Sequence, residues 1–369
     1  MGIVRTWNDA VHFQPDAFQQ FWSERLKKKR DVLLILGSGW DPRMTALLSV
    51  LKDLGGEGSR YVHLIRYSPS RSFESPHKEF IQKNLSELDQ IMQNWIEKRN
   101  IEIITRTEEN LYIGDSEISK FYVQFNLRLF SDILVDVSSM PKSLYFTLLL
   151  ILVKNTGRQS QSTNLHVIAC QDSVLDNQII ESADDTRYLK GFTRGMTRLS
   201  NQDTPIIWAP LLARNSAVSL RKLRDHIGPT DIYPILPFPS RNPRNDDDLL
   251  AEYRQMFDSE WRLNPMNIMY AAEDDPLDVY QTLLSLLHQQ EEALKPLGGV
   301  SMVVSALSSK LSSIGAFMAA YDGNTAVAHA IGRHDPVKPI NSNFWNTANL
   351  ARFKQSLHSI WLTGEPYER

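Results

Sequence analysis

Two clusters of small, polar and charged residues in the first half of the sequence contain the residue types that bind anions. The first cluster comprises Gly37, Ser38, Gly39, Asp41 and Arg43. The second comprises Asp136, Ser138, Ser139 and Lys142. A glycine–serine turn presents backbone N–H groups to a phosphate, and a lysine at a helix start adds a charge-assisted hydrogen bond. Both clusters therefore predict contacts with an anion. The carboxylate of Asp136 would hold a sugar hydroxyl, accept a proton, orient Lys142 or simply cap a helix.

Each cluster follows a short apolar run typical of a buried strand and leads into a run typical of a helix. The expected positions are 31–36 and 133–137 for the strands, and 44–54 and 144–153 for the helices. Parallel strands that alternate with helices place their carboxyl ends at one edge of a sheet, where open α/β sheets bind ligands. Arg66 ends a further strand at 61–67, so Arg43 and Arg66 are expected at adjoining strand ends. The sequence thus predicts one site that combines cations, carboxylates and small-residue turns.

The Gly-Ser-Gly turn departs from the dinucleotide-binding fingerprint in two respects. Its third glycine is absent, and the following strand ends in Arg66-Tyr67, where a ribose-binding acid is expected. The missing glycine also argues against an S-adenosylmethionine-dependent methyltransferase, whose loop this turn otherwise resembles. A Gly-x-Gly turn that is needed only for tight backbone geometry accounts for the residues equally well.

The second half of the sequence offers further candidates at predicted strand ends. They are Glu273, Asp274, Ser308, Ser309 and Lys310. The two acids would bind a metal or act as a base, although acids before a helix are more often caps that its dipole favours. The sequence has no Walker loop, Gly-x-Ser-x-Gly elbow, His-Glu-x-x-His motif or paired cysteines. We therefore predict no metal site and cannot name a cofactor.

Composition narrows the class of protein. A chain of 369 residues is too long for one ordinary core and favours two domains. A net charge of −3 gives no strong nucleic-acid signal and no attraction to an anionic membrane. The most apolar run, 144–153, is too short to span a bilayer, so no membrane association is expected. A single cysteine, Cys170, excludes an internal disulfide and fits a cytoplasmic protein.

The order of apolar runs predicts two Rossmann-like α/β domains with mainly parallel sheets flanked by helices. We expect an N-terminal domain at 1–170, a linker at 171–204 and a second domain at 205–369. The remaining expected strands are 101–104 and 165–170 in the first domain, and 206–209, 232–236, 268–271, 301–305 and 326–331 in the second. A last helix is expected at about 344–361, on the second sheet. The two halves share this alternation without a convincing sequence repeat.

The segment Asp136-Val-Ser-Ser-Met-Pro-Lys142 resembles the strand-four motif of CRISPR-associated Rossmann-fold (CARF) domains. Gly37, Ser38 and Gly39 would match the turn after the first strand of that family, so the resemblance covers about residues 31–170. It implies binding of a nucleotide second messenger, often in a dimer, within prokaryotic antiviral defence. The glycines usual in the strand-four turn are replaced here by Ser139 and Met140.

Three functions remain open from the sequence. The first is a sensor or regulatory protein that binds a nucleotide-like small molecule, as a homodimer or with a protein partner. The second is an enzyme acting on a nucleotide or nucleoside, with a base or nucleophile at Asp136 or at Glu273 and Asp274, and a phosphate held by Lys142 or Lys310. The third is a structural interaction subunit in which the polar turns are only helix caps.

Overall fold

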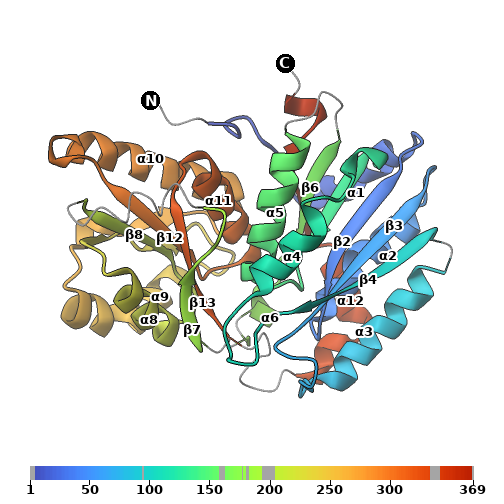
Figure 1. Ribbon diagram of the computed structural model, residues 1–369, viewed down its shortest axis with the longest axis horizontal. Helices are drawn as coiled ribbons and strands as arrows, with labels where there is room; N and C mark the ends of the chain where they lie inside the picture. Colours follow the sequence, from blue (N-terminus) through green and yellow to red (C-terminus); the bar gives the residue numbers. More distant parts are fainter. Residues whose placement is uncertain are drawn as a thin grey trace. The chain divides into compact units, whose positions relative to one another are not determined.

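The computed structural model describes residues 5–93, 95–157, 163–176, 178–179, 183–192, 204–332 and 341–367. The chain forms two compact units (Figure 1). The first unit comprises Asp9–Gln178 with Pro339–Arg369, and the second comprises Met1–Asn8 with Ile179–Lys338. Each unit has its own sheet, and the α/β fold class with two mainly parallel sheets is confirmed.

The sheet of the first unit has the strand order β1-β14-β6-β5-β2-β3-β4. The strands are β1 (Val11–Phe13), β2 (Val32–Ser38), β3 (Arg60–Ser68), β4 (Glu97–Ile104), β5 (Asp132–Asp136), β6 (Asn164–Cys170) and β14 (Leu357–Thr363). Strands β2 to β6 are parallel and, numbered along the chain, lie in the order 3-2-1-4-5. The order reverses between β2 and β5, so the prediction that these two strands are neighbours is confirmed. Ligands of such sheets bind at this reversal.

Helices cover both faces of the first sheet (Figure 1). One face carries α4 (Gly114–Tyr122) and α5 (Lys142–Thr156), which pack on each other. The other carries α1 (Pro15–Leu26), α2 (Ala46–Leu54), α3 (Lys78–Ile91) and α12 (Thr347–Lys354). Short helices add η1 (Pro42–Thr45), η2 (Leu127–Leu129), α6 (Ser173–Asp176), η6 (Ser342–Trp345) and η7 (Glu365–Tyr367). Helix α5 is apolar almost throughout because nearly all of its side chains are buried. None of the described helices is both long and apolar enough to cross a membrane.

The sheet of the second unit has the order β11-β10-β8-β12-β13-β7, with β9 paired to β8. The strands are β7 (Asp185–Tyr188), β8 (Ile206–Leu211), β9 (Asp231–Ile232), β10 (Ile235–Pro237), β11 (Met269–Ala271), β12 (Ser301–Ala306) and β13 (Ala326–Ile331). The helices are α8 (Ala217–Ile227), α9 (Asn245–Gln255), η3 (Met256–Trp261), η4 (Pro265–Asn267), α10 (Pro276–Leu294), η5 (Lys295–Leu297) and α11 (Lys310–Asp322). Strands β8, β10, β11, β12 and β13 again lie in the order 3-2-1-4-5, next to an antiparallel edge strand. The two units therefore repeat one topology that the sequence alone did not reveal.

The C-terminal segment differs from the prediction of a helix at about 344–361 on the second sheet. Helix α12 ends at Lys354, and β14 inserts between β6 and β1 of the first sheet, antiparallel to both. All seven residues of β14 are buried, including His358, Ser359 and Thr363. Because both faces of the strand are covered, its sequence lacks the apolar–polar alternation that would distinguish it from a helix. Residues from Pro339 onward therefore belong to the first unit, not to a domain at 205–369.

The expected boundaries of the two domains also differ from those of the structure. Part of the expected linker 171–204 is ordered, since it contains α6 and the edge strand β7, whereas residues 193–203 lie outside the described part. At the other end, Thr6 and Trp7 belong to the second unit. Thr6 donates from its backbone N and its hydroxyl to the carboxylate of Asp322, each at 2.7 Å, and the Trp7 ring is fully buried beside Tyr280 and Phe317. The chain thus begins in the unit that contains most of its second half.

Candidate functional site

The turn after β2 is built around two glycines that give room to protein atoms. A Cβ on Gly37 would lie 3.1 Å from the Cα of Met140, and one on Gly39 would lie 2.7 Å from the hydroxyl of Tyr67. Contacts as short as the second are not seen for real Cβ atoms, so a side chain there would displace Tyr67. Packing therefore leaves little room for a side chain at either glycine, which favours the reading that needs no ligand.

The turn after β5 is bonded directly to the turn after β2. The Ser139 hydroxyl donates to the carbonyl oxygen of Gly37 at 2.7 Å, and the Tyr67 hydroxyl donates to the carbonyl oxygen of Ser139 at 2.7 Å. These bonds join the carboxyl ends of β2, β3 and β5 at the reversal of strand order. The structure thus brings the two predicted clusters together at one edge, with Tyr67 bonded to the second of the two turns.

Asp41 and Arg43 form an internal ion pair. Asp41 accepts the backbone N–H of Arg43 at 2.9 Å and caps η1, while the Arg43 guanidinium contacts both Asp41 and Asp176 at 2.7 Å. Arg43 is only 1% exposed. Burial alone would lower its pKa, but Asp176 and Asp41 together raise it well above the usual value. Arg43 is therefore a buried counter-ion, and the expectation that it lies free to reach a phosphate does not match its position.

Asp136 at the end of β5 is buried and only half satisfied. Its Oδ1 accepts the backbone N–H of Ser138 at 2.9 Å, but its Oδ2 has no hydrogen-bond partner among the described residues. Burial raises the pKa of Asp136 to about 6, although the hydrogen bonds from Ser138 lower it. The Ser138 hydroxyl in turn accepts the backbone N–H of Cys170 at 2.8 Å. Asp136 thus holds its own turn and does not cap the following helix α5, whose N-cap position is Pro141 without a side-chain cap; none of its described contacts reaches Lys142.

The charged groups that stay accessible lie around this core. Arg66 is exposed on β3, level with Ser38 at the end of β2, because the two residues are partners in the strand register. No hydrogen bond or ion pair occupies Arg66 in the part of the chain that the structure describes. Lys142 is half-buried and is the first residue of α5. Of the charged residues predicted at this edge, Arg66 is exposed and Lys142 is half-buried, whereas the others, Asp41, Arg43 and Asp136, are buried.

Several residues that stabilise the site were not predicted. Asn84 on α3 donates to the carbonyl oxygens of Gly39 and Asp41, at 3.0 Å each, and accepts from the Trp345 indole N–H at 3.1 Å. Asp172 accepts from Arg352 at 2.7 Å. A single asparagine on an amphipathic helix carries no sequence signal of such a role. Its partner Trp345 lies in the C-terminal segment that the sequence predicts on the other sheet.

In the second unit, the predicted acids have structural partners. Glu273 accepts the backbone N–H of Arg241 at 3.0 Å, and Asp274 lies 3.9 Å from the Arg241 guanidinium. Ser309 caps α11 by accepting the backbone N–H of Ser312 at 3.1 Å, while Ser308 and Lys310 flank it. No group of three or more potential metal ligands occurs among the described residues. The contacts described for both acids are thus with Arg241, and the residue that caps α10 is the neighbouring Asp275.

Ser308, Ser309 and Lys310 nevertheless occupy a meaningful place in the topology. They follow β12, the fourth parallel strand of the second unit, just as Ser138, Ser139 and Lys142 follow β5 in the first. A serine pair and a lysine thus introduce the helix after the fourth strand in both units.

Comparisons with known proteins add little to this picture. No family model and no curated protein matches the sequence. Similar solved structures include a universal stress protein from Archaeoglobus fulgidus, 12% identical, with a TM-score of 0.25 over 82% of this chain and 96% of that one. They also include a UDP-GlcNAc 2-epimerase from Neisseria meningitidis bound to UDP-GlcNAc, 12% identical, with a TM-score of 0.22 over 78% and 85%. Such low scores support no argument about function. What the strand order and the site define is an α/β protein of two Rossmann-like units.

Proposed function

We propose that the first unit binds an anionic, nucleotide-like ligand at the carboxyl ends of β2 and β5. Arg66 and Lys142 would contact its phosphate groups, and the first turn of α5 would add the favourable end of a helix dipole. The observation that carries this proposal is that the two predicted clusters are hydrogen-bonded together at the reversal of strand order, beside Arg66, which is exposed and has no partner among the described residues. An unpaired arginine at the place where such sheets bind ligands favours an anion.

Binding without chemistry is favoured over catalysis because the reactive groups of the site are covered. Asp136 is 1% exposed, and Cys170 is fully buried, which raises the pKa of its thiol well above the usual value. A general base must come within hydrogen-bond reach of its substrate. Burial restricts that access for both groups, which favours the role of a sensor or regulatory protein. An enzyme using Asp136 remains the alternative, since its Oδ2 has no described partner.

The resemblance of Asp136–Lys142 to CARF domains extends the proposal to a nucleotide second messenger in prokaryotic antiviral defence. A homodimer or a protein partner, and a cytoplasmic location, belong to the same proposal. Tyr67 must then either remain bonded to Ser139 beneath the ligand or swing away from it. The enzyme alternative differs from the sensor in a simple observable, namely whether the nucleotide is recovered unchanged.

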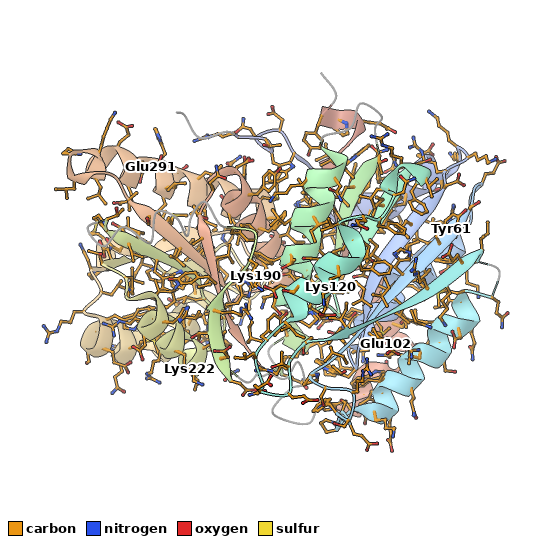
Figure 2. All side chains as sticks on the ribbon, viewed as in Figure 1. Tyr61, Glu102, Lys120, Lys190, Lys222 and Glu291 are labelled. Atoms are coloured by element: carbon orange, nitrogen blue, oxygen red, sulfur yellow. The ribbon has the colours of Figure 1, made fainter. Side chains whose placement is uncertain are left out.

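The test is calorimetry of the purified protein with a panel of nucleotides, followed by analysis of the recovered ligand. Lys142→Ala should weaken binding about tenfold or more, because a charge-assisted hydrogen bond contributes about 1.5–3 kcal/mol. Lys120→Ala is the matched control. Lys120 lies on α4 (Figure 2), near the end of that helix that leads toward the start of β5, away from the carboxyl edge. No binding to the wild-type protein refutes the proposal, whereas binding with turnover favours the enzyme.

A further inference from the structure

Arg66 is exposed and has no hydrogen-bond or ion-pair partner among the described residues, unlike two arginines of the first unit that are held by carboxylates. Arg25 is held by Asp132 and Glu365, and Arg43 by Asp41 and Asp176. Arg66 has no described partner and is level with the end of β2 through its register with Ser38. Paired residues of neighbouring strands point to the same face, so Arg66 projects from the face on which Ser38 lies. An available guanidinium thus stands at the end of the second strand of a 3-2-1-4-5 sheet.

That position has a defined role when this sheet order binds nucleotides. The phosphates lie at the turn after the first strand, and the ribose reaches the end of the second strand. An acid there accepts the ribose 2′-hydroxyl, whereas an arginine nearby accommodates a phosphate on that hydroxyl. In this chain the first-strand turn is Gly37–Asp41, and Arg66 is near the end of the second strand. Planar guanidinium groups suit phosphate because two N–H donors bind two of its oxygens.

We propose that Arg66 selects nucleotides that carry a phosphate on the ribose 2′- or 3′-oxygen over nucleotides with a free ribose diol. The inference rests on the proposed function and names the class of ligand. Arg66 would determine specificity, because the phosphate bound at the turn after β2 would be present both in nucleotides with a ribose phosphate and in those with a free diol. Arg66 would bind the ribose phosphate, while Lys142 at the start of α5 would contact the shared phosphate.

One acidic neighbour offers the competing outcome. Glu102 on β4 is exposed and is the register partner of Arg66 (Figure 2). No ion pair between Arg66 and Glu102 is present among the described contacts. If Glu102 instead accepted a ribose hydroxyl, the protein would prefer the free diol. The two residues therefore predict opposite preferences, which one set of ligands distinguishes.

The experiment is calorimetric titration with adenosine 5′-diphosphate, adenosine 2′,5′-bisphosphate and adenosine 3′,5′-bisphosphate. The wild-type protein should bind at least one bisphosphate about tenfold or more tightly than the diphosphate. Arg66→Gln should remove that difference, and Arg66→Asp should reverse it. Glu102→Gln should leave the preference in place. Because Arg66 is exposed, unchanged thermal unfolding should show that these variants fold.

The possible results distinguish a failure of the role proposed for Arg66 from a failure of the proposed nucleotide-binding function. Equal binding of the three ligands by the wild-type protein, or loss of selectivity in Glu102→Gln but not in Arg66→Gln, would overturn the role of Arg66 while leaving the site intact. A wild-type preference for the diphosphate would overturn it as well. No binding of any of the three, together with no binding across the wider nucleotide panel, would remove the proposed function itself.

Discussion

Replacing Asp136 with Asn should make the first unit more stable at neutral pH, which is unusual for a buried polar residue. The Asn side chain retains an oxygen to accept the Ser138 N–H, but it cannot ionise. In the wild-type protein, burial raises the pKa of Asp136 to about 6, so a charge without a partner on Oδ2 must form as the pH rises. The variant removes that charge and keeps the cap.

The sign and size follow from the two pKa values. The folded chain, with a pKa of about 6, binds the proton more tightly than the unfolded chain, whose value is near 3.8. The free energy of unfolding is therefore unaffected below both values, falls as the pH rises between them, and stays lower above them. The difference corresponds to about 3 kcal/mol at neutral pH. Wild type should lose up to this amount relative to Asp136→Asn between pH 4 and pH 7.

The assay must report on the first unit alone, because a chain of two units need not unfold in one step. Urea denaturation with pulsed hydrogen exchange and mass spectrometry identifies the transition in which peptides from β2 and β5 lose protection. Comparing wild type with variant at two pH values cancels the contributions of all other titrating groups. Asp9→Asn, at an exposed aspartate of the same unit, is the control and should show no pH-dependent difference. A stability gap that does not change with pH, or that shrinks as pH rises, would refute the reasoning.

Two other perturbations test the packing. Gly39→Ala should destabilise the first unit by about 1 kcal/mol, because the new methyl group displaces the Tyr67 hydroxyl from Ser139. The same substitution should destabilise a Tyr67→Phe variant clearly less. Equal losses of stability in both backgrounds, measured by urea denaturation, would contradict the contact. Trp7→Ala should destabilise the second unit by about 3–5 kcal/mol, since the buried indole packs against Tyr280 and Phe317. Hydrogen exchange should then show lower protection in peptides from β12. Lower protection only in β2 and β5 would contradict the assignment of Trp7 to the second unit.

The sequence was informative where one strand and its following turn carry the signal. The apolar runs at 31–36 and 133–137 and the polar turns after them were enough to predict neighbouring parallel strands and a common edge. The runs expected at 206–209, 301–305 and 326–331 likewise correspond to β8, β12 and β13. Each of these inferences needs only local periodicity and the rule that parallel strands share an edge.

Long-range partnership could not be predicted in the same way. Asp176 lies 133 positions from the Arg43 that it neutralises, and Trp345 lies 261 positions from Asn84. Nothing in the neighbourhood of Arg43 distinguishes a buried counter-ion from a phosphate ligand, because the difference depends on a carboxylate supplied by a distant helix. The C-terminal strand β14 could not be predicted for a related reason, since its extended conformation depends on pairing with the distant strand β6.

In both units, a side chain on the helix after the second strand holds the turn after the first strand. This shared contact helps to distinguish residues that support the sheet edge from residues that could bind a ligand there. In the first unit, Asn84 on the helix after the second strand fixes the turn after the first strand through Gly39 and Asp41. In the second, Tyr253 on the corresponding helix α9 accepts from Ser216 and donates to Ala213, again in the turn after the first strand. A role shared by both units is explained by the topology alone. Arg66 makes no described contact of this kind, so it is the residue at this edge on which the proposal of a ligand depends most.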